Sequence, residues 1–281
     1  MSGAAPPRHI WLCADDYGIS PGVNRAIRDL FDKDRLNATS VMVVGPAIGR
    51  DEVASLKAVV RESPRCAIGL HVTLTAPFRP LTMHFRPLDG DMFLPFPKLL
   101  AAGLSRRLDP ELIRAEVALQ LATFHEQFGR LADFVDGHQH AQLYPIVRDG
   151  FLAAVKQKAP KAWVRQARRN QPLLRRPVSP KAILLDLLST QFRRLASRAG
   201  LATNPAFSGA YDYSRQVDYG ALMRTFLDDL PEHSVVMCHP GFVDDVLISL
   251  DALTTTREIE HDYLASDAFP RLLKMNNLTL G

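Results

Sequence analysis

The sequence predicts an α/β fold in which a parallel sheet closes, or nearly closes, into a distorted (β/α) barrel. Six short apolar runs with strand character recur along the 281 residues, and helical patterns follow most of them. No linker divides the chain, and its length suits one α/β barrel. No GxGxxG or P-loop follows the first run, which removes the usual reason to prefer an open nucleotide-binding sheet. We therefore expect a single domain over residues 1–281.

The first strand and helix show how each element is recognised. The run HIWLCA (9–14) has strand character, and Ser20 followed by Pro21 is typical of a helix N-cap and first helical position. Further strands are expected at TSVMVV (39–44), CAIGLHVTL (66–74), DFVDGHQH (133–140), AWVRQ (162–166) and SVVMCHPG (234–241). Helices are expected near 51–61, 110–128, 144–158, 180–198 and 257–264. A long proline-rich connection over 76–97 follows the third strand, and its length suggests a lid or a partner contact.

The composition is that of a soluble globular protein, with 47% apolar and 23% charged residues. No apolar run reaches the roughly 18 residues that a membrane span needs, and the N-terminus lacks the pattern of a signal peptide. The three cysteines, Cys13, Cys66 and Cys238, are isolated within apolar runs, which indicates buried reduced thiols. A cytoplasmic protein is the expectation.

Chemically reactive side chains gather where the predicted strands end. They are Asp15 and Asp16 on the first strand, His71 on the third, Asp136, His138 and His140 on the fourth, and His239 on the last. The spacing of two on the fourth strand predicts that its three side chains share one side of an extended chain. Because the carboxyl ends of the strands form one face of a parallel barrel, we expect all these groups at one mouth.

Each of these residues also has a plainer interpretation. A lone aspartate before a helix is more often an N-cap than a catalyst, although Ser20 already serves as the cap here. A lone histidine in an apolar strand, such as His71, is usually a packed core residue. An HxH pair is a common metal-binding pattern and also a frequent accident, and His239 before Pro-Gly could cap a turn. The joint pattern favours a functional site.

Five segments in order along the chain resemble the motifs of a known family. They read ADDYGISPGVNRAI, ATSVMV, IGLHVTLT, VDGHQHAQLYP and VVMCHPG. They are similar to the ADDFG, GLHxxLT, DxHxHxH and CHPG motifs of the YdjC-like carbohydrate deacetylases, from about Arg8 to Gly241. The resemblance implies a distorted β/α barrel of the glycoside hydrolase/deacetylase type. It also implies removal of acetyl groups from N-acetylated sugars with one divalent metal ion.

Matched by position, the resemblance implies three metal ligands, Asp16, His71 and His138. It implies Asp15 as the general base and His239 as a candidate acid or transition-state stabiliser. Such chemistry needs a metal ion that lowers the pKa of water and polarises the carbonyl, a base that takes the proton of the water, and an acid for the leaving amine. One carboxylate and two imidazoles suit zinc by softness, and magnesium stays open.

Four more residues are expected to bind substrate or to orient the ligands: Asp136, His140, Gln142 and Arg165. Asp136 is interpreted as a carboxylate that orients a metal-bound histidine. Gln142 stands where many members of the family have a third histidine, so substrate contacts are expected to differ there.

The segment over about 159–200 is strongly basic and amphipathic. It holds ten basic residues and one acid, a charge of +9; since the whole chain carries +4, the rest carries −5. Its predicted helix has an apolar stripe of Ile183, Leu184, Leu187, Leu188, Phe192 and Leu195, with Arg193, Arg194 and Arg198 near its end. An ordinary barrel helix with a cationic C-terminus and a membrane-surface helix both fit this pattern.

The basic segment is also similar to that of a subgroup of the family associated with hopanoid biosynthesis. This similarity implies a lipid-linked N-acetylglucosamine substrate and peripheral contact with the inner membrane surface; a soluble chitooligosaccharide is the alternative. A nucleic-acid-binding protein on a barrel scaffold is a different class, but no such motif is present and we expect no nucleic acid partner. An amidohydrolase would carry HxH on its first strand, which here carries Asp-Asp. The prediction also allows a homodimer.

Overall fold

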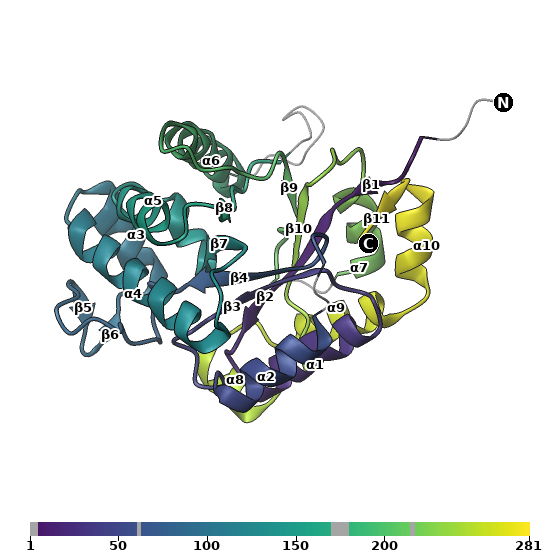
Figure 1. Cartoon of the computed structure of the whole chain (residues 1–281), viewed down its shortest axis with the longest axis horizontal. Coiled ribbons are helices and arrows are strands. Elements are labelled where there is room, and N and C mark those ends of the chain that lie inside the picture. Colours follow the sequence, from purple (N-terminus) through teal and green to yellow (C-terminus); the bar gives the residue numbers. More distant parts are fainter. Residues whose placement is uncertain (1–4, 61–62, 170–179, 214–216) are drawn as a thin grey trace.

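The main sheet has seven parallel strands. The sheet is curled, as Figure 1 shows. The computed structural model describes residues 5–60, 63–169, 180–213 and 217–281. The strand order is β8-β7-β4-β3-β2-β10-β9. These strands are β2 (Trp11–Tyr17), β3 (Ala38–Val41), β4 (Ala67–Val72), β7 (Phe134–Gly137), β8 (Trp163–Val164), β9 (Phe207–Ser208) and β10 (Val235–Cys238). Their carboxyl ends meet at one face, as the sequence predicts.

Backbone hydrogen bonds link each edge strand of the curled sheet to a segment beside the other edge strand. The N–H of Val164 donates to the carbonyl of Ala202 at 2.9 Å, and the N–H of Phe207 donates to the carbonyl of Arg168 at 3.0 Å. Val164 and Thr203 also form an isolated parallel bridge. These contacts bring β8 next to the segment that leads into β9. The predicted fold class, an α/β fold with a distorted barrel, is confirmed.

Helices surround the outside of the sheet (Figure 1). They are α1 (Pro21–Asp32), α2 (Arg50–Val59), α3 (Phe96–Leu104), α4 (Pro110–Phe128), α5 (Val147–Lys158), α6 (Pro180–Arg198), α7 (Tyr219–Phe226), α8 (Asp245–Leu250), α9 (Thr255–Ala265) and α10 (Ala268–Met275). The five expected helices after the first are present within a few residues of their predicted bounds. The sequence missed β9, α3, α7, α8 and α10, because short elements carry too little periodicity to be recognised. Within the described ranges, no helix has the length and apolar character to cross a membrane.

The predicted start of α1 is confirmed in detail. The hydroxyl oxygen of Ser20 accepts a hydrogen bond from the N–H of Val23 at 3.2 Å, and Pro21 occupies the first helical position. Capping residues also mark both ends of α4. The carboxylate of Asp109 caps its N-terminus, and Gly129, with φ of 68°, ends the helix. The two adjacent aspartates before α1 are therefore not needed as caps.

The proline-rich connection over 76–97 is fixed to the barrel at several points. It contains a small hairpin of β5 (Leu88–Asp89) and β6 (Met92–Phe93). The buried carboxylate of Glu116 on α4 accepts hydrogen bonds from the N–H groups of Leu81 and Thr82 at 3.0 and 2.8 Å. A role for this connection as a lid or a partner contact stays a prediction.

The two ends of the described chain lie side by side (Figure 1). Strand β1 (Arg8–His9) pairs in parallel with β11 (Leu278–Thr279). The buried side-chain amide of Asn37 donates to the carbonyls of Ile10 and Leu280 at 2.8 and 2.9 Å. Asn37 thereby ties the first and last segments to β3, at the end of the sheet opposite the mouth.

Candidate active site

A β-bulge in β2 allows two consecutive aspartates to serve the same site. Neighbouring residues of a regular strand point to opposite faces. In β2 the pairing with β3 shifts between Ala14 and Tyr17, and Asp16 has φ of 70°. Asp15 and Asp16 are both 1% exposed. Bulges commonly re-aim side chains beside active sites, and aspartate tolerates the left-handed conformation better than most residues.

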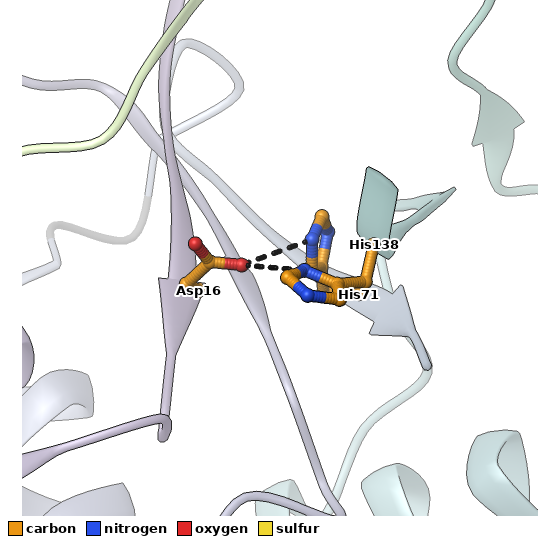
Figure 2. A group of neighbouring side chains, drawn as sticks. All are labelled: Asp16, His71 and His138. Atoms are coloured by element: carbon orange, nitrogen blue, oxygen red, sulfur yellow. Dashed lines mark hydrogen bonds and ion pairs between the residues drawn. The ribbon is translucent and has the colours of Figure 1, made fainter. Parts of the chain in front are cut away.

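Asp16, His71 and His138 form a buried cluster in which one carboxylate oxygen faces both rings (Figure 2). Asp16 Oδ1 lies 3.3 Å from His71 Nε2 and 3.0 Å from His138 Nδ1. The three atoms are close enough together to hold one metal ion, since they all lie within 4.8 Å of one another. The structure therefore brings together the three residues that the resemblance implied as ligands.

His71 is oriented by groups on the two strands that flank β4. Its Nδ1 lies 2.6 Å from Asp136 Oδ1 on β7 and 3.0 Å from Ser40 Oγ on β3. Burial alone would lower the pKa of His71, but the nearby carboxylates, Asp136 first, raise the pKa to about 10. A carboxylate on the far nitrogen of a ring is the usual support for a metal-binding histidine. This arrangement therefore fits a metal site.

Arg165 links Asp15 to Asp136. Its guanidinium donates two hydrogen bonds to Asp15, at 2.7 and 2.6 Å, and lies 2.8 Å from Asp136 Oδ2. Burial alone would raise the pKa of the Asp15 carboxyl, but Arg165, followed by His71, holds that pKa well below its usual range. Arg165, Asp15 and Asp136 are fully or almost fully buried.

A second acidic cluster, of Cys13, Asp15 and Asp136, also has metal-ligand types at close range. The guanidinium of Arg165 already contacts both of its carboxylates. Burial raises the pKa of the Cys13 thiol well above its usual value. This cluster is therefore better explained as a buried ion-pair network than as a metal site.

Arg257 on α9 contacts the other oxygen of Asp16. Its Nη2 donates to Asp16 Oδ2 at 2.7 Å and to Asp251 Oδ2 at 2.7 Å. Burial alone would raise the pKa of Asp16, but Arg257, followed by His138, holds the pKa well below its usual range. The sequence placed a helix here but gave no signal for this role, because Arg257 lies 241 positions from Asp16 and outside the motifs.

His239 follows β10 directly, as predicted, and two unpredicted residues hold it. Its backbone N–H donates to Glu260 Oε2 at 2.5 Å, and its Nδ1 lies 3.2 Å from the hydroxyl of Tyr213. The hydroxyl of Tyr211 donates to Glu260 Oε1 at 2.7 Å. Burial raises the pKa of the Glu260 carboxyl. Arg257 and Glu260 are three positions apart on α9, so this helix supports two parts of the site.

The predicted alternation after Gly137 is wrong. Strand β7 ends at this residue, and His138–Leu143 form a 3₁₀ segment in which Gln139 and His140 have φ of 55° and 57°. Asp136, His138 and His140 therefore do not line one side of a strand. The turn brings the side chain of Gln142 against Gly137, where an added Cβ would lie 2.7 Å from Gln142 Oε1.

After this turn, the side chains of His140 and Gln142 contact different residues. The ring of His140 packs edge-on against Phe207, and burial, followed by the charge of Arg165, lowers its pKa to about 3. The side-chain amide of Gln142 donates to the carbonyl of Arg165 at 3.2 Å. Within the described part of the chain, His140 Nδ1 and Gln142 Oε1 have no hydrogen-bond partner.

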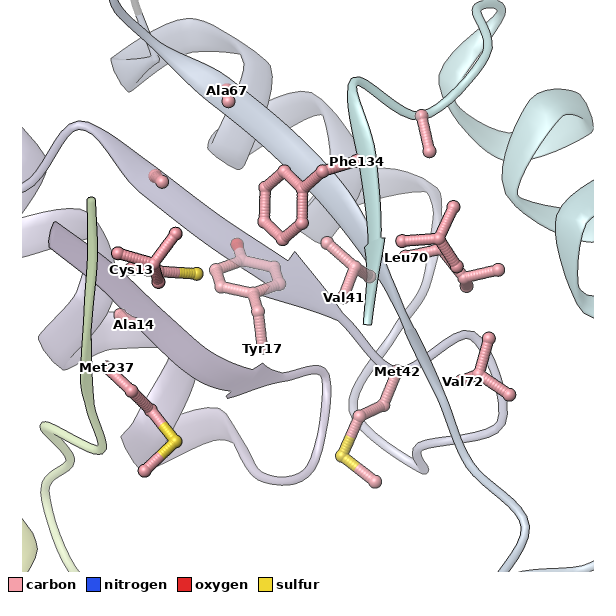
Figure 3. Packing of buried hydrophobic residues seen from close by; sticks show 14 of the residues in the cluster. Cys13, Ala14, Tyr17, Val41, Met42, Ala67, Leu70, Val72, Phe134 and Met237 are labelled. Atoms are coloured by element: carbon pink, nitrogen blue, oxygen red, sulfur yellow. The ribbon is translucent and has the colours of Figure 1, made fainter. Parts of the chain in front are cut away.

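Apolar packing holds the strands that carry these groups (Figure 3). The ring of Phe134 on β7 covers Gly69 on β4, where an added Cβ would lie 2.4 Å from the ring. The labelled side chains around it come from several neighbouring strands or their ends: Cys13, Ala14, Tyr17, Val41, Met42, Ala67, Leu70, Val72 and Met237. The tyrosine of the ADDYG segment belongs to this core, and its hydroxyl donates to Glu52 at 2.7 Å.

The basic segment divides into a packed part and an exposed part. Of the predicted apolar stripe on α6, Leu188 and Phe192 are buried, whereas Ile183, Leu184 and Leu187 are exposed. The stripe therefore does not form one continuous buried face. Two of the ten basic residues of this segment, Arg175 and Arg176, lie outside the described residues.

Known proteins resemble this chain over nearly its whole length. The family model described as YdjC-like protein matches residues 9–275. A carbohydrate deacetylase of Thermoanaerobacter pseudethanolicus (strain ATCC 33223 / 39E) is 24% identical over 277 residues, which cover 97% of each chain. Among solved structures, a protein of Enterococcus faecalis V583 that is provisionally named for cellobiose-phosphate cleavage has a TM-score of 0.76 and 18% identity. That match covers 98% of this chain and 97% of the other.

Proposed function

Because the chain belongs to the YdjC-like protein family, we propose that it is a metal-dependent hydrolase that removes the acetyl group from an N-acetylated sugar. The observation that carries the proposal is the buried cluster of Asp16, His71 and His138 at the carboxyl ends of the strands. Beside this cluster lie the ionised carboxylate of Asp15 and the imidazole of His239, which suit acid-base chemistry. The name of the 24% identical relative supports the substrate class.

Asp16, His71 and His138 would hold the divalent ion. The metal, when bound, polarises the carbonyl of the acetyl group and lowers the pKa of water. The set of two imidazoles and one carboxylate favours zinc, and magnesium is the harder alternative. Three protein ligands leave open positions, as a catalytic metal site requires.

Asp15 would accept the proton of the attacking water. Its paired contact with Arg165 supports this role in two ways: the carboxylate stays ionised, and its plane is fixed. Arg165 is thus proposed to orient the base, and Asp136 to orient His71. His140 and Gln142 are proposed to contact the substrate, and the unpartnered His140 Nδ1 and Gln142 Oε1 support this assignment.

His239 would protonate the leaving amine. The hydroxyl of Tyr213 lies against its Nδ1, so that the Nε2 is the nitrogen left to serve the substrate. Glu260 restrains the backbone of His239 through the N–H contact at 2.5 Å. Base and acid would then be supplied by β2 and by the end of β10, which are neighbours in the sheet.

The test is acetate release from N-acetylglucosamine-containing substrates. Metal-stripped protein should be inactive and should recover with zinc or magnesium. Asp15→Asn and His138→Ala should both abolish release, because one removes the base and the other a ligand. His125→Ala, at an exposed position of α4, is the matched control and should leave the rate unchanged. Undiminished hydrolysis after metal removal, or in either site variant, would contradict the assigned roles.

The finer proposal is that the sugar is carried by a membrane lipid. On α6, Leu187, Arg194 and Arg198 are exposed, and their spacing of seven and four places them on one helix face. An exposed apolar group followed by arginines on one face suits contact with an anionic lipid surface. Leu187 is 65% exposed.

The position of α6 supports this contact. The N–H of Ala167 donates to Ser189 Oγ at 3.1 Å, and the N–H of Arg169 donates to Asp186 Oδ1 at 3.4 Å. These donors follow the carboxyl end of β8, so α6 lies beside the end of the sheet that carries the candidate site. The sugar headgroup could then occupy the site while its lipid part stays in the membrane surface that α6 contacts.

Co-sedimentation with phosphatidylglycerol vesicles at low and high salt tests the lipid contact. Binding should be present at low salt and weaker at high salt, since screening reduces the attraction of the arginines. Leu187→Gln should weaken binding, whereas Leu104→Gln on α3, at a position that is 57% exposed, should not. No binding to the vesicles, together with acetate release from chitooligosaccharides, would instead favour a soluble substrate.

A further inference from the structure

The two oxygens of Asp16 have different partners. Oδ1 lies within 3.3 Å of both His71 Nε2 and His138 Nδ1. Oδ2 instead accepts a hydrogen bond from Arg257 at 2.7 Å. One oxygen of this carboxylate therefore faces the candidate metal position, and the other is held by a guanidinium on its far side.

Arg257 is itself held in place on three sides. In addition to its contact with Asp16, its Nη2 donates to Asp251 Oδ2 at 2.7 Å, and its Nε donates to the carbonyl of Leu253 at 2.9 Å. The side chain has no exposed surface. The planar guanidinium therefore links Asp16 to the segment that leads into α9 and has little freedom to move.

We infer that Arg257 is a positioning residue that restricts Asp16 to binding the proposed metal ion through one oxygen, Oδ1. A free carboxylate can bind a metal through one or both oxygens. A charge-assisted hydrogen bond to Oδ2 favours the first mode, because in the second mode the metal ion and the Arg257 guanidinium would compete for the same oxygen. This inference rests on the proposed function, since it presumes that the cluster binds a metal.

The restriction would keep coordination positions open for water and the acetyl carbonyl. A catalytic ion needs such positions, whereas a site closed by protein ligands is structural. Groups that contact metal ligands from behind commonly set their orientation in this way. Arg257 would thus orient the proposed ligand Asp16, just as Asp136 would orient the proposed ligand His71.

The experiment uses Co²⁺ as the probe, added to the metal-stripped full-length protein. The intensity of the visible absorption of Co²⁺ falls as its coordination number rises. In Arg257→Met, which removes the charge and the donors, Asp16 can bind through both oxygens, so the visible band should lose intensity. Arg257→Lys keeps a charged donor and should largely restore the wild-type band. Asp251→Asn keeps an acceptor for Arg257 and should match the wild type.

Two further variants separate the possible outcomes. His138→Ala should abolish the band, which assigns it to this site. If Arg257→Met does not fold, Arg257→Met with Asp251→Leu removes both members of an ion pair in which Arg257 is buried and Asp251 is partly exposed, and proteins often tolerate apolar replacement of such a pair. A wild-type band in the folded Arg257→Met or double variant would overturn the inference alone. Failure of the wild-type protein to bind Co²⁺ would overturn the proposed metal site, and the inference with it.

Discussion

Arg165 and Asp15 form a two-point ion pair, with N–O distances of 2.7 and 2.6 Å, between residues 150 positions apart. Both side chains are almost completely buried. The pair fixes the plane of the carboxylate and keeps it charged in surroundings that would otherwise favour its neutral form. The charge of the Asp15 carboxylate in the site therefore depends on a contact that forms only when the chain folds.

Arg165→Met is expected to shift the acid side of the pH-activity profile upward. Arg165 holds the pKa of Asp15 down, and without it burial raises that pKa. The base acts only when it is ionised. On acidification, the variant should therefore lose activity at a pH roughly 1–3 units higher than the wild type does. Arg165→Lys should keep part of the wild-type profile. An unshifted acid limb in folded Arg165→Met protein would contradict this role.

Asp136→Asn is expected to weaken metal binding by about 10- to 100-fold, as loss of a carboxylate behind a metal-binding histidine commonly does. The cause is the loss of the charged contact at 2.6 Å that orients His71. Competition with a chromophoric chelator measures the affinity. Asp91→Asn, at an exposed position, is the control. Equal affinities for the two variants would argue against Asp136 as the orienting group.

Gly69→Ala is expected to destabilise the fold by about 1–3 kcal/mol, as overpacking of a core typically does. The added methyl group would meet the ring of Phe134 at 2.4 Å. Thermal or urea unfolding measures the change. Combining Gly69→Ala with Phe134→Leu should cost less than the sum of the single changes, because the smaller side chain relieves the collision. Strict additivity would show that the ring is not the cause.

Glu116→Ala is expected to loosen the segment around Leu81 and Thr82. It removes the acceptor for both backbone N–H groups, at 3.0 and 2.8 Å, and leaves them to exchange with water. Hydrogen exchange should become faster at these two amides. Glu126→Ala, at an exposed position of the same helix, should leave them protected. Unchanged exchange would mean that other contacts hold the connection.

Much of the fold could be predicted because its signals are local. The apolar runs that form the main strands and the cap of α1 depend on residues within a few positions of one another. The short β9, α7, α8 and α10 depend on packing against elements distant in sequence, so they carried no comparable signal. The turn at Gln139 and His140 was also missed, since a spacing of two is common to strands and to chains that fold back.

The sequence by itself determined which strand ends carry Asp15, Asp16, His71, Asp136 and His239, because the order of polar residues after apolar runs is written along the chain. Tertiary structure decided how these groups are paired. Arg165 reaches Asp15, and Arg257 reaches Asp16, only after the strands curl and α9 packs against α1 and α7. The physical reason is burial: charges removed from water need partners at hydrogen-bond distance, and only the folded chain determines which distant residues supply them.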